Sequence, residues 1–265
     1  MPAAALERST ALALMARAPE RTGLFVDYDG TLAPIVENPA QARPVPGASR
    51  VLELLGERLA LVAVVSGRPA AFLLDELRLP PGSPVRIAGH YGIERAHANG
   101  EIALPEGAAR YEQALAALGR ELRHELPDGA ELEQKRFGIT FHWRRNPEAG
   151  AAALALAHDV ARRSNYEVRE GKLAVELVAP FGIDKASTVR ELAASLEVAG
   201  AIGDDLGDLA AFEALGALAE QGALATVRIA VDGRETPHAL FENCELVVVG
   251  PEEVVTLLEE LARLL

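Results

Sequence analysis

Six short apolar runs constrain the fold of this chain more than any other feature of its sequence. They are LFV, LALVAVV, VRIAG, VAGAIG, TVRIAV and ELVVV, and segments with helical spacing lie between most of them. The runs are largely continuous rather than alternating, which is typical of strands inside a parallel sheet that is covered by helices on both faces. The sequence therefore predicts an α/β fold.

The middle of the chain has a different pattern. Apolar and polar residues alternate over 139–144, so that one face of this strand is apolar and the other polar. Together with its surroundings this segment predicts a helix, a hairpin, a second helix and a second hairpin that turns at Glu170-Gly171. We expect an inserted α+β module over about 105–180, within a core formed by residues 1–104 and 181–265.

Two carboxylates lie one residue apart directly after the first apolar run, in LFVDYDG. Residues i and i+2 of an extended segment point the same way, so Asp27 and Asp29 share one side of the strand end, and Gly30 allows a sharp turn. Like charges this close repel each other, which favours a cation between them, and hard oxygen ligands suit Mg²⁺. The alternative is an ordinary Asp-Gly turn after a strand.

Two other runs also end in polar groups, at the carboxyl ends of strands where parallel sheets bind ligands. Residues 66–68, Ser-Gly-Arg, offer a hydroxyl and a flexible backbone for phosphate oxygens, although Ser-Gly turns are common in themselves. Asp204, Asp205 and Asp208 follow the later run. Capping of a helix N-terminus explains one of these acids, but not easily three.

Lysine is scarce in this chain, because only three of its 26 basic residues are Lys. A lysine is a compact point charge, so each one is a candidate for a specific role. Lys185 stands at the expected N-terminus of a helix, where a cation is electrostatically unfavourable. A local anion would offset that cost, and the alternative is a solvated lysine that tolerates a few tenths of a kcal/mol.

Together these groups fit phosphoryl transfer to a carboxylate. An aspartate and a phosphate dianion repel each other, and Mg²⁺ with a lysine offsets this repulsion and stabilises charge on the phosphoryl oxygens. A second carboxyl two residues further on can protonate the leaving alkoxide and later take a proton from the attacking water.

The ordered segments DYDGT, SGR, GIDK and GDDLGD resemble the four signature segments of the haloacid dehalogenase superfamily of phosphatases. That resemblance implies a Rossmann-like parallel-sheet core with a mobile cap, here of the inserted C2 type. Within the superfamily the chain is similar to trehalose-6-phosphate phosphatases over nearly its whole length, in LFVDYDGTLAPIVENPAQARP, VAVVSGR, GHYGIE, ELEQKRFGITFHWR and GKLAVEL. This similarity implies Mg²⁺-dependent hydrolysis of trehalose 6-phosphate through an aspartyl-phosphate intermediate.

The resemblance also implies a role for each matching residue. Asp27 is the expected nucleophile and Asp29 the general acid/base. The expected sets are catalysis by Asp27, Asp29 and Lys185; metal binding by Asp27, Asp29, Asp204, Asp205 and Asp208; phosphate binding by Ser66, Gly67, Arg68 and Lys185; and substrate binding by His90, Glu133, Lys135, Arg144 and Glu176. The chain departs from the family where Gly207-Asp208-Leu209 replaces the usual Thr-Asp-Glu.

Other interpretations use the same residues. A capped phosphatase for sucrose phosphate, or for a glucosyl- or mannosyl-glycerate phosphate, would share the chemistry and differ in the cap. A phosphomutase would have to shield its aspartyl-phosphate from water. A phospho-receiver module needs neither Asp29 nor an inserted cap.

Charge and cysteine content narrow the partners and the compartment. A net charge of −13 and a pI near 5.0 argue against nucleic acid or an anionic membrane as a general partner. A single cysteine excludes an intramolecular disulfide and fits a reducing compartment. The first 23 residues are typical of an Ala-rich surface helix rather than a signal peptide. We therefore expect a cytoplasmic enzyme with a small sugar-phosphate substrate, and the sequence does not indicate an oligomeric state.

Overall fold

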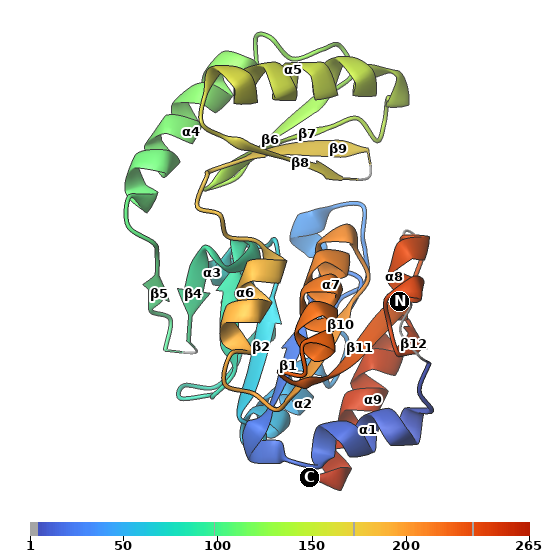
Figure 1. Ribbon diagram of the computed structural model, residues 1–265. Helices are drawn as coiled ribbons and strands as arrows, with labels where there is room; N and C mark the ends of the chain where they lie inside the picture. Colours follow the sequence, from blue (N-terminus) through green and yellow to red (C-terminus); the bar gives the residue numbers. More distant parts are fainter. Residues whose placement is uncertain (1–4, 98, 172, 235) are drawn as a thin grey trace. The chain divides into compact units, whose positions relative to one another are not determined.

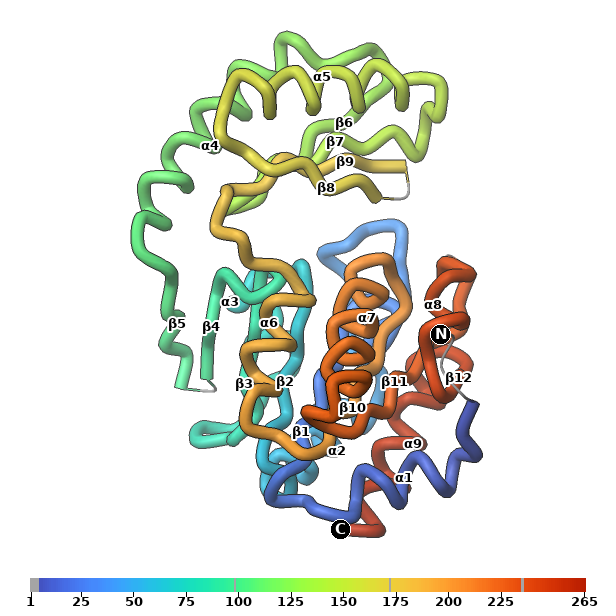
Figure 2. Tube along the Cα trace, in the orientation of Figure 1, coloured from blue at the N-terminus to red at the C-terminus, as the bar shows by residue number. Residues whose placement is uncertain are grey.

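The computed structural model describes residues 5–97, 99–171, 173–234 and 236–265. The chain divides into two compact units, a core unit of Met1–Ala103 with Ile183–Leu265 and an inserted unit of Leu104–Gly182. The trace in Figure 2 can be followed from blue to red: it leaves the core unit once, forms the inserted unit, and then returns.

A mainly parallel sheet of eight strands forms the centre of the core unit (Figure 1). In order across the sheet the strands are β12 Leu246–Val249, β11 Ala225–Asp232, β10 Val198–Gly203, β1 Thr22–Val26, β2 Leu61–Val65, β3 Arg86–Gly89, β4 Glu94–Ala96 and β5 Ile102–Ala103. The six strands from β12 to β3 are parallel. The predicted α/β fold is confirmed.

Helices cover both faces of this sheet. The α-helices of the core unit are α1 Arg8–Ala16, α2 Ala48–Gly56, α3 Ala70–Leu77, α6 Lys185–Leu192, α7 Leu206–Glu220, α8 His238–Glu242 and α9 Gly250–Leu264, and its 3-10 turns are η1 Pro19–Arg21, η2 Pro39–Gln41 and η3 His90–Gly92. Leu24 and Val26 of β1 pack into the same apolar cluster as α1, α2, α3 and α9. Phe25, between them, packs with α6, α7 and α8. This alternation is why the strands are apolar on both faces.

The register of the central strands determines where the functional site can form. β1 lies between β10 and β2 and is parallel to both, with Val26 opposite Ile202 on one side and Val64 on the other. The carboxyl ends of three strands that are far apart in the sequence therefore meet at one edge of the sheet.

The edge of the sheet beyond β3 differs from the expected all-parallel arrangement. β4 pairs antiparallel with β3, and β5 pairs antiparallel with β4. These strands have three and two residues, too few for an apolar run to reveal them in the sequence.

The inserted unit is a four-stranded antiparallel sheet with helices on one face (Figure 1). Its elements are α4 Ala108–Leu122, β6 Glu131–Gln134, β7 Gly138–His142, η4 Pro147–Ala149, α5 Gly150–Arg163, β8 Glu167–Gly171 and β9 Ala174–Val178, with strand order β6-β7-β9-β8. Ile139 and Phe141 are fully buried, and α4 and α5 contact their strand. The other face carries the cross-strand row Glu133, Thr140, Glu176 and Arg169.

The second hairpin turns later than predicted. Glu170 and Gly171 belong to β8 and pair with Val175 and Ala174, so the reversal lies beyond Gly171. Leu173 has a φ of 55°, in the left-handed region where a tight reversal is made. The Glu-Gly pair was therefore a misleading turn signal.

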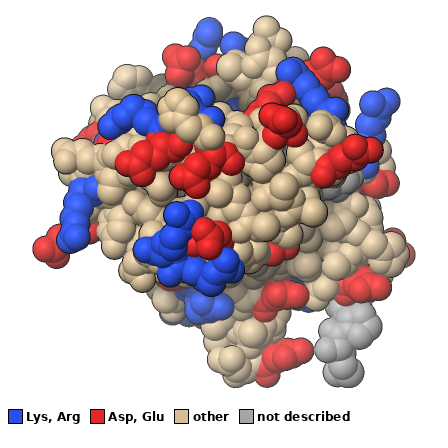
Figure 3. Space-filling view, turned by 90° about the horizontal axis from the view of Figure 1, so that it is seen from above, with Lys and Arg blue, Asp and Glu red and all other residues tan. Residues whose placement is uncertain are grey.

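On the molecular face in Figure 3, basic and acidic side chains are interspersed, and one gathering of basic side chains surrounds an acidic one. Of the helices in the described ranges, none combines the length and the apolar character that a bilayer crossing requires.

Candidate active site

Three polar residues follow directly after the three central strands. Asp27 follows β1, Ser66 follows β2 and Asp204 follows β10. Main-chain bonds continue the ladder one residue past the strand ends, because the Asp27 amide donates to Ile202 O at 3.0 Å. The Ser66 amide likewise donates to Ala88 O at 3.0 Å. The parallel sheet thus brings together the strand ends that the sequence indicated.

Glycine is required at two points beside these acids. Gly30 has a φ of 78°, and a Cβ there would lie 2.2 Å from Asp204 Oδ2. A Cβ on Gly203 would lie 2.0 Å from the carboxyl carbon of Asp208. The chain can therefore pass this close to the carboxylates only where there is no side chain.

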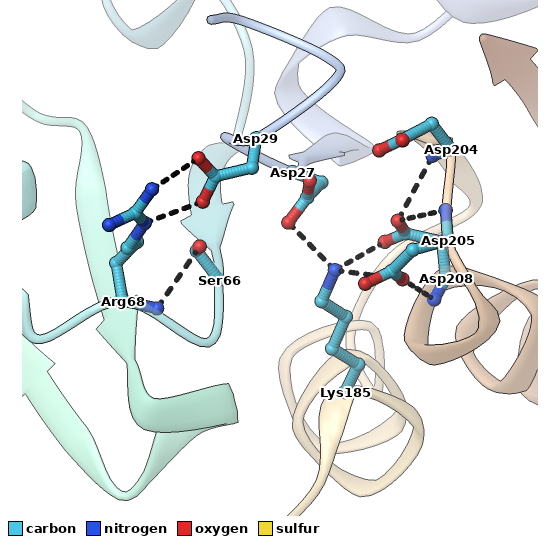
Figure 4. Close-up of polar contacts among 8 residues, drawn as sticks. All are labelled: Asp27, Asp29, Ser66, Arg68, Lys185, Asp204, Asp205 and Asp208. Carbon is cyan, nitrogen blue, oxygen red and sulfur yellow. Dashed lines mark hydrogen bonds and ion pairs between the residues drawn. The ribbon is translucent and has the colours of Figure 1, made fainter. Parts of the chain in front are cut away.

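Lys185 is the cation at the centre of the acidic cluster (Figure 4). Its Nζ lies 2.7 Å from Asp27 Oδ1, 2.8 Å from Asp208 Oδ1 and 3.5 Å from Asp205 Oδ1. Lys185 is the first residue of α6, and its side chain is only 3% exposed. The anion expected near this lysine is thus present as three protein carboxylates.

A reciprocal capping box holds two of these acids in place. Asp205 is the N-cap of α7, and its Oδ1 accepts from the Asp208 amide at 2.8 Å. Asp208 Oδ2 accepts from the amides of Asp204 and Asp205 at 3.1 and 3.2 Å. Capping therefore accounts for two of the three acids, and each of the two also faces Lys185.

Burial and mutual repulsion change the protonation of the cluster. Burial, reinforced by neighbouring carboxylates and opposed by Lys185, raises the pKa of Asp27 to about 8. Burial also raises the pKa of Asp204 to about 8, with further contributions from Asp208 and Asp205. Burial lowers the pKa of Lys185, but the surrounding carboxylates raise it well above the usual value, so the ammonium stays charged.

The cluster has the properties of a site for a hard divalent cation. Asp27, Asp204 and Asp208 bring carboxylate oxygens within 4.8 Å of one another, and all three residues are buried. Within the described residues, Oδ1 of Asp204 is buried and has no hydrogen-bond partner. Three carboxylates contact the Lys185 ammonium and a fourth, that of Asp204, belongs to the same cluster, so an added positive charge would offset both the repulsion and the unpartnered oxygen.

Asp29, the second acid of the first motif, contacts a different cation. Arg68 Nε donates to Asp29 Oδ2 and Arg68 Nη2 to Asp29 Oδ1, both at 2.6 Å, in the two-point geometry of a strong pair. The Arg68 guanidinium also lies 4.7 Å from the centre of the Phe72 ring. Figure 4 shows Asp29 directed to Arg68 and Asp27 to Lys185. Asp29 is outside the three-acid group, and the guanidinium expected to bind phosphate is engaged with a carboxylate.

Residues 66–68, which follow β2 and include the Ser66 hydroxyl, form a loop that we call the hydroxyl loop. Contacts with neighbouring residues set its conformation. Ser66 is 2% exposed, and its Oγ accepts from the Arg68 amide at 3.3 Å. A Cβ on Gly67 would lie 2.8 Å from the hydroxyl oxygen of Tyr91. Ser66 and Gly67 therefore remain candidates for phosphate binding on a tightly packed loop.

The predicted substrate-binding residues fall in two places. His90 is buried in η3 of the core unit. In the inserted unit, Glu133 and Glu176 both oppose Thr140 in the cross-strand row, and Lys135 Nζ lies 3.0 Å from Glu176 Oε1. Arg144 is exposed in the turn after β7. The sheet thus brings Glu133, Lys135 and Glu176 to one face, with Arg144 beyond the end of the strand.

Gly207 and Leu209 are the two residues that depart from the family pattern. Gly207 lies near Lys185, and Leu209 lies against the apolar core. A Cβ on Gly207 would lie 3.3 Å from Lys185 Cδ, so this glycine packs against the lysine stem. Leu209 packs against the apolar cluster beneath α7.

Comparison with known proteins gives consistent results. Residues 25–243 match the family model described as trehalose-phosphatase. The chain is 31% identical over 264 residues to a trehalose-phosphate phosphatase from Mycobacterium leprae, covering 94% of this chain and 59% of that protein. It is 32% identical over 260 residues to one from Mycobacterium tuberculosis, covering 94% and 63%. The chain thus spans about three fifths of the length of these curated relatives.

Solved structures share the fold. The C-terminal domain of a trehalose-6-phosphate phosphatase from Candida albicans superposes with a TM-score of 0.76 at 24% identity, covering 99% of each chain. A haloacid dehalogenase-like hydrolase from Bacteroides thetaiotaomicron superposes with a TM-score of 0.62 at 18% identity, covering 90% of this chain and 98% of that one.

Proposed function

Because the chain belongs to the trehalose-phosphatase family, we propose that it is a Mg²⁺-dependent phosphatase of the haloacid dehalogenase type that hydrolyses trehalose 6-phosphate to trehalose and phosphate. The observation that carries this proposal is the contact of Lys185 Nζ with Asp27 at 2.7 Å, inside a buried cluster of acids. A lysine next to the carboxylate that acts as nucleophile can neutralise the charge of an incoming phosphate.

We assign the metal to Asp27 and Asp204. The unpartnered Oδ1 of Asp204 supports this, while both oxygens of Asp208 already accept from Lys185 or from amides. Asp205 and Asp208 are better suited to holding Lys185, and both oxygens of Asp29 are taken by Arg68. When bound, Mg²⁺ would supply charge neutralisation between the nucleophilic carboxylate and the phosphoryl oxygens.

In the first step, a carboxylate oxygen of Asp27 attacks the phosphorus and the bond from phosphorus to the sugar oxygen breaks. Lys185 and the Ser66 hydroxyl are assigned to hold the phosphoryl oxygens. The departing sugar oxygen takes a proton from Asp29, which leaves Asp29 as a carboxylate. Arg68 orients the Asp29 carboxylate through two hydrogen bonds, and this pair must loosen before Asp29 takes up the proton that it donates.

In the second step, water attacks the phosphorus of the aspartyl-phosphate. Asp29 takes a proton from this water as its oxygen bonds to phosphorus, and the bond from phosphorus to Asp27 breaks. Phosphate leaves, Asp27 is again a carboxylate and Asp29 again carries a proton. The sum of the two steps is the hydrolysis of one phosphate ester.

The polar face of the inserted unit is assigned to the sugar. Glu133 and Glu176 provide acceptors and Lys135 provides donors on one sheet face, the combination that ring hydroxyls require. Arg144 and His90 are kept as further substrate-binding candidates.

The test is phosphate release from trehalose 6-phosphate, sucrose 6-phosphate and glucose 6-phosphate side by side, each with Mg²⁺ and with a chelator. The proposal expects release that depends on Mg²⁺ and is fastest with trehalose 6-phosphate. Faster hydrolysis of sucrose 6-phosphate would show that trehalose 6-phosphate is not the preferred substrate. Turnover that continues in the presence of the chelator would overturn the metal assignment.

A further inference from the structure

The two groups assigned to the phosphoryl oxygens come from distant parts of the sequence. Ser66 follows β2, and Lys185 begins α6. Transition-state stabilisation requires the hydroxyl and the ammonium at a fixed separation, since small displacements of such groups are costly. A tight turn between β3 and β4 contacts both elements.

This turn, His90–Gly92, has an unusual backbone. His90 and Tyr91 have φ values of 46° and 63°, in the left-handed region that residues with a side chain rarely occupy, and Gly92 has a φ of 113°. Two successive non-glycine residues in this region persist only when surrounding contacts hold them there. The turn is therefore held by its neighbours.

On one side the turn holds the hydroxyl loop. The His90 amide donates to Arg68 O and the Tyr91 amide donates to Ser66 O, each at 2.8 Å. The Tyr91 ring also lies directly over Gly67, where a Cβ would be 2.8 Å from the hydroxyl oxygen. The loop thus has its main chain bonded to the turn at both ends.

On the other side the turn holds α6 through one side chain. Thr188 lies one helical turn after Lys185 and is fully buried, and its Oγ1 donates to Tyr91 O at 2.8 Å. A Cβ on Gly92 would lie 2.0 Å from the same Oγ1, so the backbone approaches the hydroxyl as closely as glycine allows. Arg95 Nη2 adds a donor to Thr188 Oγ1 at 3.3 Å.

We propose that Thr188 is a positioning residue for the phosphatase reaction: its hydroxyl, through the His90–Gly92 turn, fixes Lys185 relative to Ser66. We call the contacts of the His90–Gly92 turn with Ser66, Arg68 and Thr188 the brace. Tyr91 is its central residue, because the Tyr91 amide donates to Ser66 O and the Tyr91 carbonyl accepts from Thr188 of α6. The inference rests on the proposed function only in assigning Ser66 and Lys185 to the same phosphoryl group.

The chain provides a matched control for testing this brace. Thr22 is also fully buried, and its Oγ1 donates to a main-chain carbonyl, Ala18 O, at 2.9 Å, but it stands at the opposite end of β1 from the site. Thr188→Val and Thr22→Val each replace a buried hydroxyl with a methyl group of similar size. Thr188→Ser keeps the hydroxyl, and Thr188→Ala is the substitute where the valine variant does not fold.

The kinetic readout is kcat and KM for trehalose 6-phosphate and for p-nitrophenyl phosphate. We expect Thr188→Val to lower kcat for both esters about tenfold with a smaller change in KM, Thr188→Ser to restore most of kcat, and Thr22→Val to leave kcat unchanged. Equal kcat values for Thr188→Val and Thr22→Val, or a serine variant as slow as the valine variant, would overturn the proposal.

Hydrogen exchange separates failure of the brace from failure of the proposed function. Exchange of the His90 and Tyr91 amides should be faster in Thr188→Val and unchanged in Thr22→Val. If the wild type releases no phosphate from either ester, the proposed function fails, while unchanged exchange of these two amides in Thr188→Val overturns the brace by itself.

Discussion

Each unit of this molecule contains a lysine paired with acidic side chains, and the two settings differ. Lys185 in the core unit is 3% exposed and lies within 3.5 Å of three carboxylates. Lys135 in the inserted unit is 21% exposed and pairs with Glu176 at 3.0 Å. Removal of the Lys185 ammonium would leave several buried carboxylates without a counter-ion, whereas removal of the more exposed Lys135 would leave only the carboxylate of Glu176. The core cluster is therefore suited to catalysis. The side chains on the sheet face can more readily give up their contacts with one another and form contacts with a ligand.

The largest effect on activity is expected when the nucleophile, Asp27, is replaced. Asp27→Asn should lower kcat by on the order of 10⁴-fold or more, because the amide cannot attack phosphorus. The fold should persist, because Asn has the shape of Asp and the change removes one member of a buried cluster whose acids repel one another. Steady-state phosphate release and a circular-dichroism melt measure both, and substantial turnover by the folded variant would remove Asp27 from its assigned role.

The second contrast compares the two lysines directly. Lys185→Met should lower the free energy of unfolding by about 3 kcal/mol, because Asp27 and Asp208 lose their buried counter-ion. Lys135→Met, the matched change on the sheet face, should lower it by a smaller amount, about 1 to 2 kcal/mol, because only the carboxylate of Glu176 loses its partner. Urea unfolding of both variants without added metal checks this, and equal losses would contradict the distinction between the two regions.

Metal binding should depend on the core acids. Asp204→Asn is expected to raise the Mg²⁺ concentration for half-maximal activity about tenfold or more, because it removes a charged ligand. Mg²⁺ should also raise the melting temperature of the wild type and have less effect on this variant. A melting temperature that responds equally to Mg²⁺ in both proteins would place the ion elsewhere.

The smallest effect is expected on the sheet face. Glu133→Ala should raise KM for trehalose 6-phosphate several-fold, with kcat and the melting temperature nearly unchanged. Glu131, two residues earlier on the same face of β6, pairs with exposed Arg145 and provides the control. If Glu131→Ala raises KM as much as Glu133→Ala does, the sugar contact is not specific to Glu133.

The same comparison shows what the sequence could predict. The apolar runs predicted the parallel sheet, and a parallel sheet necessarily brings the ends of β1, β2 and β10 to one edge. Asp27, Ser66 and Asp204 could therefore be grouped from their positions after apolar runs. The conflict between Lys185 and the helix N-terminus was also a usable signal, because the compensating anions are present.

Partners between elements could not be predicted in this way. Nothing in the spacing of Asp29 and Arg68 indicates that they pair, since the contact depends on how two loops fold. Thr188 gave no signal either, because a threonine within a helix is ordinary until its hydroxyl is seen to bond Tyr91. The strands β4 and β5 were missed because they are too short to form a pattern.

The assignment of Asp27 as the residue that receives the phosphoryl group can be tested by trapping the phosphorylated enzyme. Enzyme, Mg²⁺ and trehalose 6-phosphate are mixed, quenched within the first turnover, and reduced with borohydride, which converts an aspartyl-phosphate into homoserine. Peptide mass spectrometry should find homoserine at position 27, dependent on substrate and absent from a sample in which Mg²⁺ is chelated. Homoserine at another acidic residue, or a completed turnover with position 27 unmodified at every quench time, would show that Asp27 is not the phosphoryl acceptor.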